Sequence, residues 1–292
     1  MSNLKYKLRN IYYSYIKSWF VYQETKKWNI LNDEETLDYL LSHHCSLSRF
    51  GDGEFGIIWG WGNGFQHEDE KLATRLKEVL SATDVENHIN AIPFPLKKWK
   101  GLYPRDFWPG FTAFYIDRLR PLIDPSQLYL NTQVTRFYYE HLDKSHCREH
   151  LNKLRQLWNN EDVVIVEGDK TRSGIGNDLY DNAHSVSRIL APSLHAFERY
   201  DEILNVICQN VGKDKLVLLC LGMTATVLAY DLAKLGYWAL DIGHLDIEYE
   251  WFLSGRLDRF AIKGKFTSEA VNGRSVKECN DPVYKAQIIC EI

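Results

Sequence analysis

The sequence lacks the features that define several large classes of protein. Its 292 residues include six cysteines, none of them in a CxxC pair, so buried free thiols in a reducing cytoplasm are expected. No window of eighteen residues is apolar throughout, which argues against a transmembrane helix. The first residues also lack the apolar run and the small-residue cleavage site of a signal peptide. We therefore expect a cytoplasmic protein.

The sequence also lacks an excess of positive charge. Its formal net charge is -4, so nucleic acid is not expected as a partner. The glycine-containing loop from Glu167 to Asp178 matches neither a Walker sequence nor GxGxxG, and no internal repeat or low-complexity segment interrupts the chain. What the chain does contain is 45% hydrophobic and 25% charged residues, the balance of a soluble globular protein.

Short apolar runs alternate with amphipathic segments through most of the chain. This pattern is typical of an α/β fold whose mostly parallel sheet carries helices on both faces. No linker rich in Pro, Gly or Ser divides the chain, so we predict one domain over residues 31–292 after a helical extension over residues 1–30. Strands are predicted at Ser46–Phe50, His88–Pro93, Tyr129–Val134, Asp162–Val166, Val186–Leu190, Leu216–Leu221 and Trp238–Ile242, with Tyr284–Ile292 as a strand or packed tail. Helices are predicted from Asn32 or Asp33 through Leu41 and at Glu68–Leu80, Phe137–Leu142, Cys147–Trp158 and His195–Val211, and Lys97–Phe111 is expected to be a long ordered loop.

The first 25 residues are basic and aromatic. Four cations precede the first acid, Glu24, and apolar residues recur at helical spacing. Such a segment resembles an amphipathic helix that lies in a membrane interface. The alternative is a helix that packs on the domain or on a second subunit in a homodimer. The extension is thus a candidate peripheral membrane contact at the inner face of the membrane.

The stretch from Lys215 to Trp251 is the clearest β-α-β unit of the sequence. Gly222 supplies a tight turn after the first strand, Thr224 is placed to cap the helix, and Gly236 ends it. Ligands of parallel sheets bind outside the carboxyl ends of the strands. A dense polar set follows the second strand there: Asp241, His244, Asp246, Glu248 and Glu250.

Two earlier loops also carry polar residues at predicted strand ends. Gly51-Asp52-Gly53-Glu54 allows a tight turn that brings two carboxylates together, and carboxylate oxygens suit Mg²⁺ or Mn²⁺. Arg49 is placed to pair with a phosphate or with one of these acids. Such a turn is also common on ordinary protein surfaces.

The other loop runs from Glu167 to Asp178 and places Lys170 and Arg172 among glycines. Flexible backbone with two cations suits a pyrophosphate, whereas a solvated loop is the alternative.

At these three loops the chain resembles a known family. The segments are Arg49-Phe-Gly-Asp-Gly-Glu54, Val166-Glu-Gly-Asp-Lys-Thr-Arg172 with Gly176-Asn-Asp178, and Leu221-Gly-Met-Thr-Ala-Thr226 with Asp241-Ile-Gly-His-Leu-Asp-Ile-Glu-Tyr-Glu-Trp251. Together they look like the GT-D-type glycosyltransferases, over roughly residues 33–269. The resemblance implies a Rossmann-like domain that binds a nucleotide sugar, typically a UDP-hexose, with a divalent cation. Family members build glycans on bacterial surface proteins and polysaccharides.

The resemblance also implies roles for individual residues. The family's Asp-x-Glu motif falls on Asp52 and Glu54, which would hold Mn²⁺ or Mg²⁺. Its late acidic block puts His244 and Glu250 at the reaction centre, with Glu250 as the expected base and His244 at the leaving group or beside that base. The expected donor-binding residues are Arg49, Lys170, Arg172, Thr224 and Asp246.

These observations lead to the hypothesis of hexosyl transfer, of glucose or galactose, from a UDP-sugar to a glycan or glycoprotein acceptor. Two rival functions remain at this stage. A nucleotide-sugar or sugar-phosphate hydrolase could use the same sheet, because fold alone does not fix activity. A non-catalytic glycan-binding module could use the aromatic loop from Trp99 to Phe111.

Overall fold

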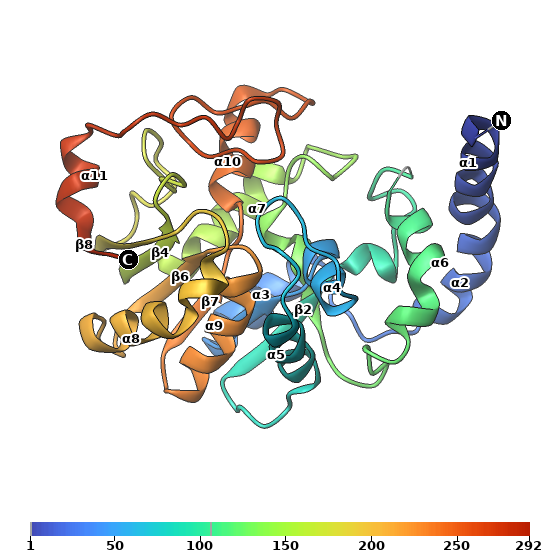
Figure 1. The fold of residues 1–292 in the computed structure, drawn as a ribbon, viewed down its shortest axis with the longest axis horizontal. Helices are drawn as coiled ribbons and strands as arrows, with labels where there is room; N and C mark the ends of the chain where they lie inside the picture. Colours follow the sequence, from blue (N-terminus) through green and yellow to red (C-terminus); the bar gives the residue numbers. More distant parts are fainter. Residues whose placement is uncertain (1, 106) are drawn as a thin grey trace.

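The structure is a computed structural model that describes residues 2–105 and 107–292. Within these ranges, eight parallel strands form one sheet in the order β3-β2-β1-β7-β6-β4-β5-β8 (Figure 1). The predicted α/β fold with a parallel sheet is confirmed. The boundary expected near residue 30 stays a prediction. The strands are β1 Ser46–Arg49, β2 His88–Ile92, β3 Leu130–Asn131, β4 Asp162–Gly168, β5 Ser185–Ala191, β6 Leu216–Cys220, β7 Trp238–Asp241 and β8 Ile288–Glu291.

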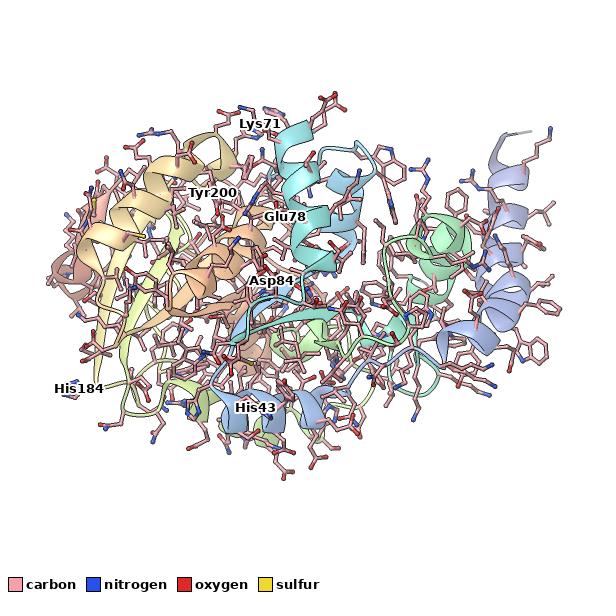
Figure 2. All side chains as sticks on the ribbon, turned by 90° about the horizontal axis from the view of Figure 1, so that it is seen from below. His43, Lys71, Glu78, Asp84, His184 and Tyr200 are labelled. Carbon is pink, nitrogen blue, oxygen red and sulfur yellow. The ribbon has the colours of Figure 1, made fainter. Side chains whose placement is uncertain are left out.

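Helices cover both faces of this sheet. Side chains alternate along its buried strands, so each strand presents apolar residues to both faces, and both must be covered. In β6, Leu216 and Leu218 join one core cluster, and Val217 and Leu219 join the cluster on the other face. Figure 2 shows the two helical layers, with Glu78 of α5 and Tyr200 of α8 on one side of the sheet and His43 of α3 on the other. The helices on the first face are α3 Asp33–His43, α7 Cys147–Leu154 and α10 Leu245–Ser254, and those on the second are α4 Asp52–Ile58, α5 Glu70–Ser81, α8 Tyr200–Asn210 and α9 Met223–Lys234.

The remaining helices lie at the ends of the sheet. Near one end, α6 packs beside the N-terminal helix, which stands apart from the sheet (Figure 1). At the other end, α11 precedes β8, the edge strand. These segments are α1 Ser2–Ile11, the π-helical η1 Tyr12–Lys17, α2 Ser18–Thr25, α6 Trp108–Leu119 and α11 Pro282–Gln287, and the short 3₁₀ turns are η2 Phe94–Leu96, η3 Thr132–Thr135, η4 Arg155–Trp158 and η5 Ala196–Arg199.

Several local predictions were wrong. The strand expected at Tyr129–Val134 joins the sheet over Leu130–Asn131, with Tyr129 in an isolated bridge to Ile30, before the chain turns into η3. The segment expected to be a helix at Phe137–Leu142 forms turns. The expected loop at Lys97–Phe111 contains the start of α6, where Pro109 occupies the first turn and favours a helix.

The cap and the polar block of the β-α-β unit also differ from the prediction. The N-cap of α9 is Gly222 rather than Thr224, since the helix already begins at Met223. The late acidic block is not a loop, because most of it forms α10, whose Leu245, Tyr249 and Trp251 enter the core.

The six cysteines are free thiols, three of them buried, among the described residues. No helix in those residues is long and apolar enough to cross a membrane.

Candidate active site

A cleft of about 670 Å³ opens at the carboxyl ends of β1 and β7. The loops after β1, β3, β6 and β7 line it, together with the start of α6 and three residues of the C-terminal segment, Leu257, Arg259 and Glu269. This is the edge of the sheet at which parallel α/β folds bind ligands. A smaller cavity of about 40 Å³ adjoins the cleft and shares Phe65, Gly222 and His244 with it.

Two acids of the Gly-Asp-Gly-Glu turn lie in this cleft. α4 begins directly after β1, so Asp52 and Glu54 fall in its first turn. One oxygen of Glu54, Oε2, accepts the Gly51 N–H at 2.7 Å, which is the glutamate half of a capping box, since glycine has no side chain to supply the other half. Burial, with the nearby carboxylate of Asp241 as the next cause, raises the pKa of Glu54 to about 7. Asp52 stands open to the cleft, and partial enclosure there raises its pKa.

No cation pairs with either acid. Within the described residues, no Lys, Arg or His nitrogen lies within 4.0 Å of a carboxylate oxygen of Asp52 or Glu54. The third acid at this point, Asp241, has a partner, because Arg49 Nη1 lies 3.5 Å from its Oδ1. Three carboxylates therefore share this end of the cleft with one directly paired cation, a donor set that suits a divalent metal ion.

Arg49 is held in place by the backbone around it. Its Nε donates to the Thr132 carbonyl at 3.2 Å. A Cβ at Gly243, whose φ is +52°, would stand 2.3 Å from Arg49 Nη1, so this position needs glycine. Arg49 lines the cleft, as predicted, but it is partly engaged by Asp241.

His244 also lines the cleft. It precedes α10, and its ring packs edge-on against Phe65 with 5.4 Å between ring centres. Burial lowers the pKa of His244, although the Glu269 carboxylate, 3.9 Å from Nδ1, acts in the opposite direction. The imidazole is therefore neutral near pH 7, which suits a hydrogen-bonding role toward a ligand.

Two arginines that the sequence did not single out, Arg136 and Arg259, also line the cleft. Arg136 makes two parallel contacts to Glu269, at 2.8 and 2.9 Å, and a third to Glu140 at 3.2 Å. Arg259 reaches the same two acids, at 3.1 and 3.7 Å. The arginine charges hold the pKa of Glu269 well below its usual range although burial opposes them. Arg136 and Glu269 are 133 residues apart, so no local motif could have indicated this pair.

Glu250 and Asp246 do not meet the carboxylates of the cleft. Glu250 is absent from the cleft lining, and its Oε1 accepts Lys265 Nζ at 2.8 Å and Asn177 Nδ2 at 2.7 Å. Asp246 borders the small cavity, and its carboxylate is bound by the same Lys265, by Asn177 and by the Gly174 N–H. Both acids therefore anchor the loop after β4 to α10.

The two cations of that loop are also occupied elsewhere. Arg172 is buried, has a φ of +55°, and donates to the carbonyls of Gly264 at 2.7 Å and Lys277 at 2.5 Å. Lys170 is exposed, and its Nζ lies 3.9 Å from Asp169. Neither residue lines the cleft or the small cavity. Arg172 therefore clamps the C-terminal segment, and the donor-binding role expected of Lys170 and Arg172 stays a prediction.

The start of α9 does face the cleft, but not through Thr224. Gly222 and Met223 line both the cleft and the small cavity, whereas Thr224 is buried and lines neither. Gly222 has a φ of +53°, which lets β6 turn sharply into the helix. The free N–H groups at this helix start give the site a partial positive charge.

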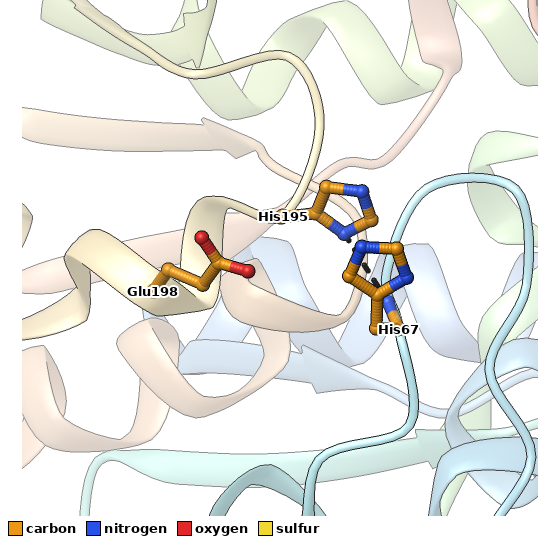
Figure 3. A group of neighbouring side chains, drawn as sticks. All are labelled: His67, His195 and Glu198. Atoms are coloured by element: carbon orange, nitrogen blue, oxygen red, sulfur yellow. Dashed lines mark hydrogen bonds between the residues drawn. The ribbon is translucent and has the colours of Figure 1, made fainter.

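A separate group, His67, His195 and Glu198, has ligand atoms within 4.8 Å of one another (Figure 3). The two imidazoles stack with centres 3.5 Å apart and planes 13° from parallel, and the backbone N–H of His67 donates to His195 Nδ1 at 3.2 Å. A nitrogen lone pair lies in the plane of its ring, so two parallel rings do not point at one ion. The group links the loop after α4 to the loop after β5 without forming a preset metal site.

Comparison with known proteins places this geometry in a family. The model of the glycosyltransferase GT-D fold matches residues 47–270. The glycosyltransferase GlyD of Streptococcus pneumoniae serotype 4 (strain ATCC BAA-334 / TIGR4) is 37% identical over 265 residues, which are 89% of this chain and 32% of GlyD. The probable glycosyl transferase Gly of Streptococcus gordonii is 35% identical over 272 residues, 92% of this chain and 39% of Gly. The chain thus spans about a third of the length of these curated relatives.

Solved structures agree with this match. A highly conserved domain of unknown function 1792, described as having a distinct glycosyltransferase fold, is 34% identical and superposes with a TM-score of 0.88 over 94% of this chain and 99% of its own. A glycosyltransferase of the same domain family from Streptococcus sanguinis is 34% identical, with a TM-score of 0.85 over 91% of this chain and 99% of its own.

Proposed function

This chain belongs to the glycosyltransferases of the GT-D fold, and we propose that it moves a hexose, glucose or galactose, from a UDP-sugar to an acceptor hydroxyl. The acceptor class that we propose is a bacterial surface glycan or glycoprotein. The relatives are named as glycosyltransferases and come from streptococci, which supports this class.

The observation that carries the proposal is the unpaired acidic end of the cleft. Asp52 and Glu54 face an open volume without a cation in ion-pair contact, and the burial of Glu54 disfavours its charged form. A divalent cation would favour that form, and the second oxygen of Glu54 is not used by the Gly51 cap. We propose that Asp52 and Glu54 hold Mn²⁺ or Mg²⁺, which when bound supplies charge neutralisation for a departing diphosphate.

The chain's own groups would complete the binding of the donor. Backbone N–H groups at Gly222 and Met223 favour an anion at the start of α9. Arg49 would orient a phosphate or the metal-binding carboxylates, and neutral His244 would donate a hydrogen bond to the leaving group. These contacts would be strongest as negative charge builds on the diphosphate, which is when they lower the barrier.

The placement of Glu250 changes the role that we propose for it. Its carboxylate is bound by Lys265 and Asn177 outside the cleft, so it is not positioned to accept a proton from an acceptor there. We propose that Glu250 positions the loop after β4, and that the base lies among the acids that line the cleft. Glu250→Gln should then lower protein stability more than turnover.

The test is a release assay with a panel of nucleotide sugars, with and without Mn²⁺ and a glycan acceptor. We expect UDP release that depends on acceptor and metal, and at least a roughly 100-fold loss of turnover in Asp52→Asn, the scale of one electrostatic contact in the transition state. Glu86→Gln, an exposed loop acid outside the cleft, is the matched control. Melting with Mn²⁺ gives a second readout, in which metal should stabilise the wild type and Glu86→Gln but not Asp52→Asn.

The rival functions predict different products. Release of UDP and free hexose at the same rate without acceptor would make the protein a hydrolase. Binding of glycan with no nucleotide release would make it a non-catalytic module. Full activity in EDTA would contradict the metal site but leave the transfer reaction standing.

A further inference from the structure

The N-terminal helix exposes an apolar face that the described chain leaves about half uncovered. Seven large hydrophobic side chains between residues 8 and 20 are 48–64% exposed. Single exposed hydrophobic residues are ordinary on protein surfaces, but a contiguous set of this size marks an interaction site. They are Leu8, Ile11, Tyr12, Tyr15, Ile16, Trp19 and Phe20.

The spacing of these residues makes them one continuous surface. Leu8, Tyr12, Ile16 and Phe20 recur every four residues, and Ile11, Tyr15 and Trp19 form a second row beside them. The fully buried positions at this end of the helix are Ser18, Val21 and Thr25, so the helix buries mostly small residues and leaves most of its large apolar residues exposed. A helix of a soluble domain normally has the opposite arrangement.

The helix is held firmly against α6, so the exposed face cannot turn inward without breaking contacts. Tyr13 packs edge-on against Phe114, with 4.9 Å between ring centres. At Gly110 a Cβ would stand 2.7 Å from Ser14 Oγ, so the two helices approach closely there. Arg120 fastens the far end through contacts of 2.9 and 2.8 Å to Glu24.

The charges around this face identify its partner. Residues 5–23 contain four cations and no acid, and the first acid, Glu24, is already paired with Arg120. A second copy of the same face would bring two basic surfaces together without acids between them, which disfavours a homodimer. We infer that this helix binds flat on an anionic lipid surface, with its aromatic and aliphatic residues in the interface and its lysines against the headgroups.

This placement would bring the cleft close to the lipid surface. α6, on which the helix packs, begins at Trp108, and Phe107 and Trp108 line the cleft. Arg105, two residues earlier, lies over the Tyr15 ring at 4.2 Å. The mouth of the cleft and the lipid-binding face are thus joined through one helix. An acceptor held at the membrane would reach the site directly.

The test is co-sedimentation of the full chain with phosphatidylcholine vesicles that contain or lack 30% phosphatidylglycerol, a composition chosen for the assay. We expect the wild type to bind the anionic vesicles and to be released by salt. Trp19→Ser/Phe20→Ser should lower the partition coefficient at least about tenfold, which corresponds to about 1.4 kcal/mol. Lys5→Gln/Lys7→Gln should lower it roughly thirtyfold, since each lysine near an anionic surface contributes about 1 kcal/mol and this variant neutralises two.

Two controls separate this inference from its alternatives. Leu253→Ser removes an exposed apolar residue away from the N-terminal face and should bind vesicles like the wild type. Unchanged melting of the face variants shows that they remain folded. The inference is overturned if the wild type ignores anionic vesicles, or if it is a lipid-free dimer that Trp19→Ser/Phe20→Ser converts to monomer.

Discussion

Replacing Arg172 by Ala separates the role that the structure gives this residue from the role that the sequence suggested. As a donor-binding residue, Arg172 would contribute to UDP affinity and little to stability. As a clamp, it fixes the carbonyls of Gly264 and Lys277 to the loop after β4. The variant should therefore unfold more easily and bind UDP almost normally.

The size of the effect follows from two hydrogen bonds that carry a charged donor. Each such bond contributes about 1.5–3 kcal/mol, and the carbonyls of a released segment recover part of this from water. We expect a loss of about 3 kcal/mol in the free energy of unfolding, measured by urea denaturation. Amide exchange in residues 264–277 should accelerate because the segment loses its attachment.

Two further variants provide the comparison. Lys170→Ala removes an exposed cation two residues away and should change stability by less than about 0.5 kcal/mol. Arg172→Lys keeps the charge, but a single ammonium group lacks the divergent N–H groups of a guanidinium and cannot reach both carbonyls. An intermediate loss of stability is therefore expected. If Arg172→Ala is as stable as Lys170→Ala and loses UDP affinity more than tenfold, the clamp is refuted and the anion site is restored.

Two other predictions concern buried charge. Burial raises the pKa of Asp33 to about 7 from 3.8, so the folded state holds a proton that the unfolded chain releases, and stability should fall by up to about 4 kcal/mol from pH 4 to pH 7. Asp33→Asn should flatten this dependence in urea titrations, and an unchanged slope would contradict it. Arg188→Met removes the cation that lies 2.5 Å from the buried carboxylate of Glu167 and leaves that carboxylate unpaired. The free energy of unfolding should fall by about 3–5 kcal/mol. Glu167→Gln in the same chain should recover part of that loss in urea denaturation, and no recovery would show that the pair is not its source.

Local patterns were enough to predict most of the sheet. β4 and β6 are short apolar runs bounded by turn residues, and such runs become buried parallel strands whatever the rest of the chain does. The capping box of Asn32 and Glu35 is likewise complete within four residues. The sequence did not predict α10 because its many acids are typical of a loop. The helix is favoured by the core contacts of Tyr249 and Trp251, and these contacts involve distant parts of the chain.

The candidate site was predictable only where its residues follow a strand directly. Asp52, Glu54 and His244 occupy such positions and do line the cleft. Arg136 and Glu269 come from an irregular turn and from the C-terminal segment, so their pairing depends on the tertiary fold. Lys170 and Arg172 show the limit of the motif, since a basic glycine-containing loop can bind backbone carbonyls, as Arg172 does, as readily as phosphates.

The distribution of ion pairs gives the strongest reason to place the chemistry at Asp52 and Glu54. Buried acids are stable in a fold only when cations or hydrogen bonds compensate them. Around the cleft this fold supplies such partners to most of its acids. Lys265 binds Asp246 and Glu250, Arg188 binds Glu167, and Arg136 binds Glu269. Among the described residues, Asp52 and Glu54 receive no ion pair, although Glu54 is partly buried and both line the cleft. A fold that compensates the neighbouring acids and leaves these two without a cation is best explained if the missing charge arrives with a ligand.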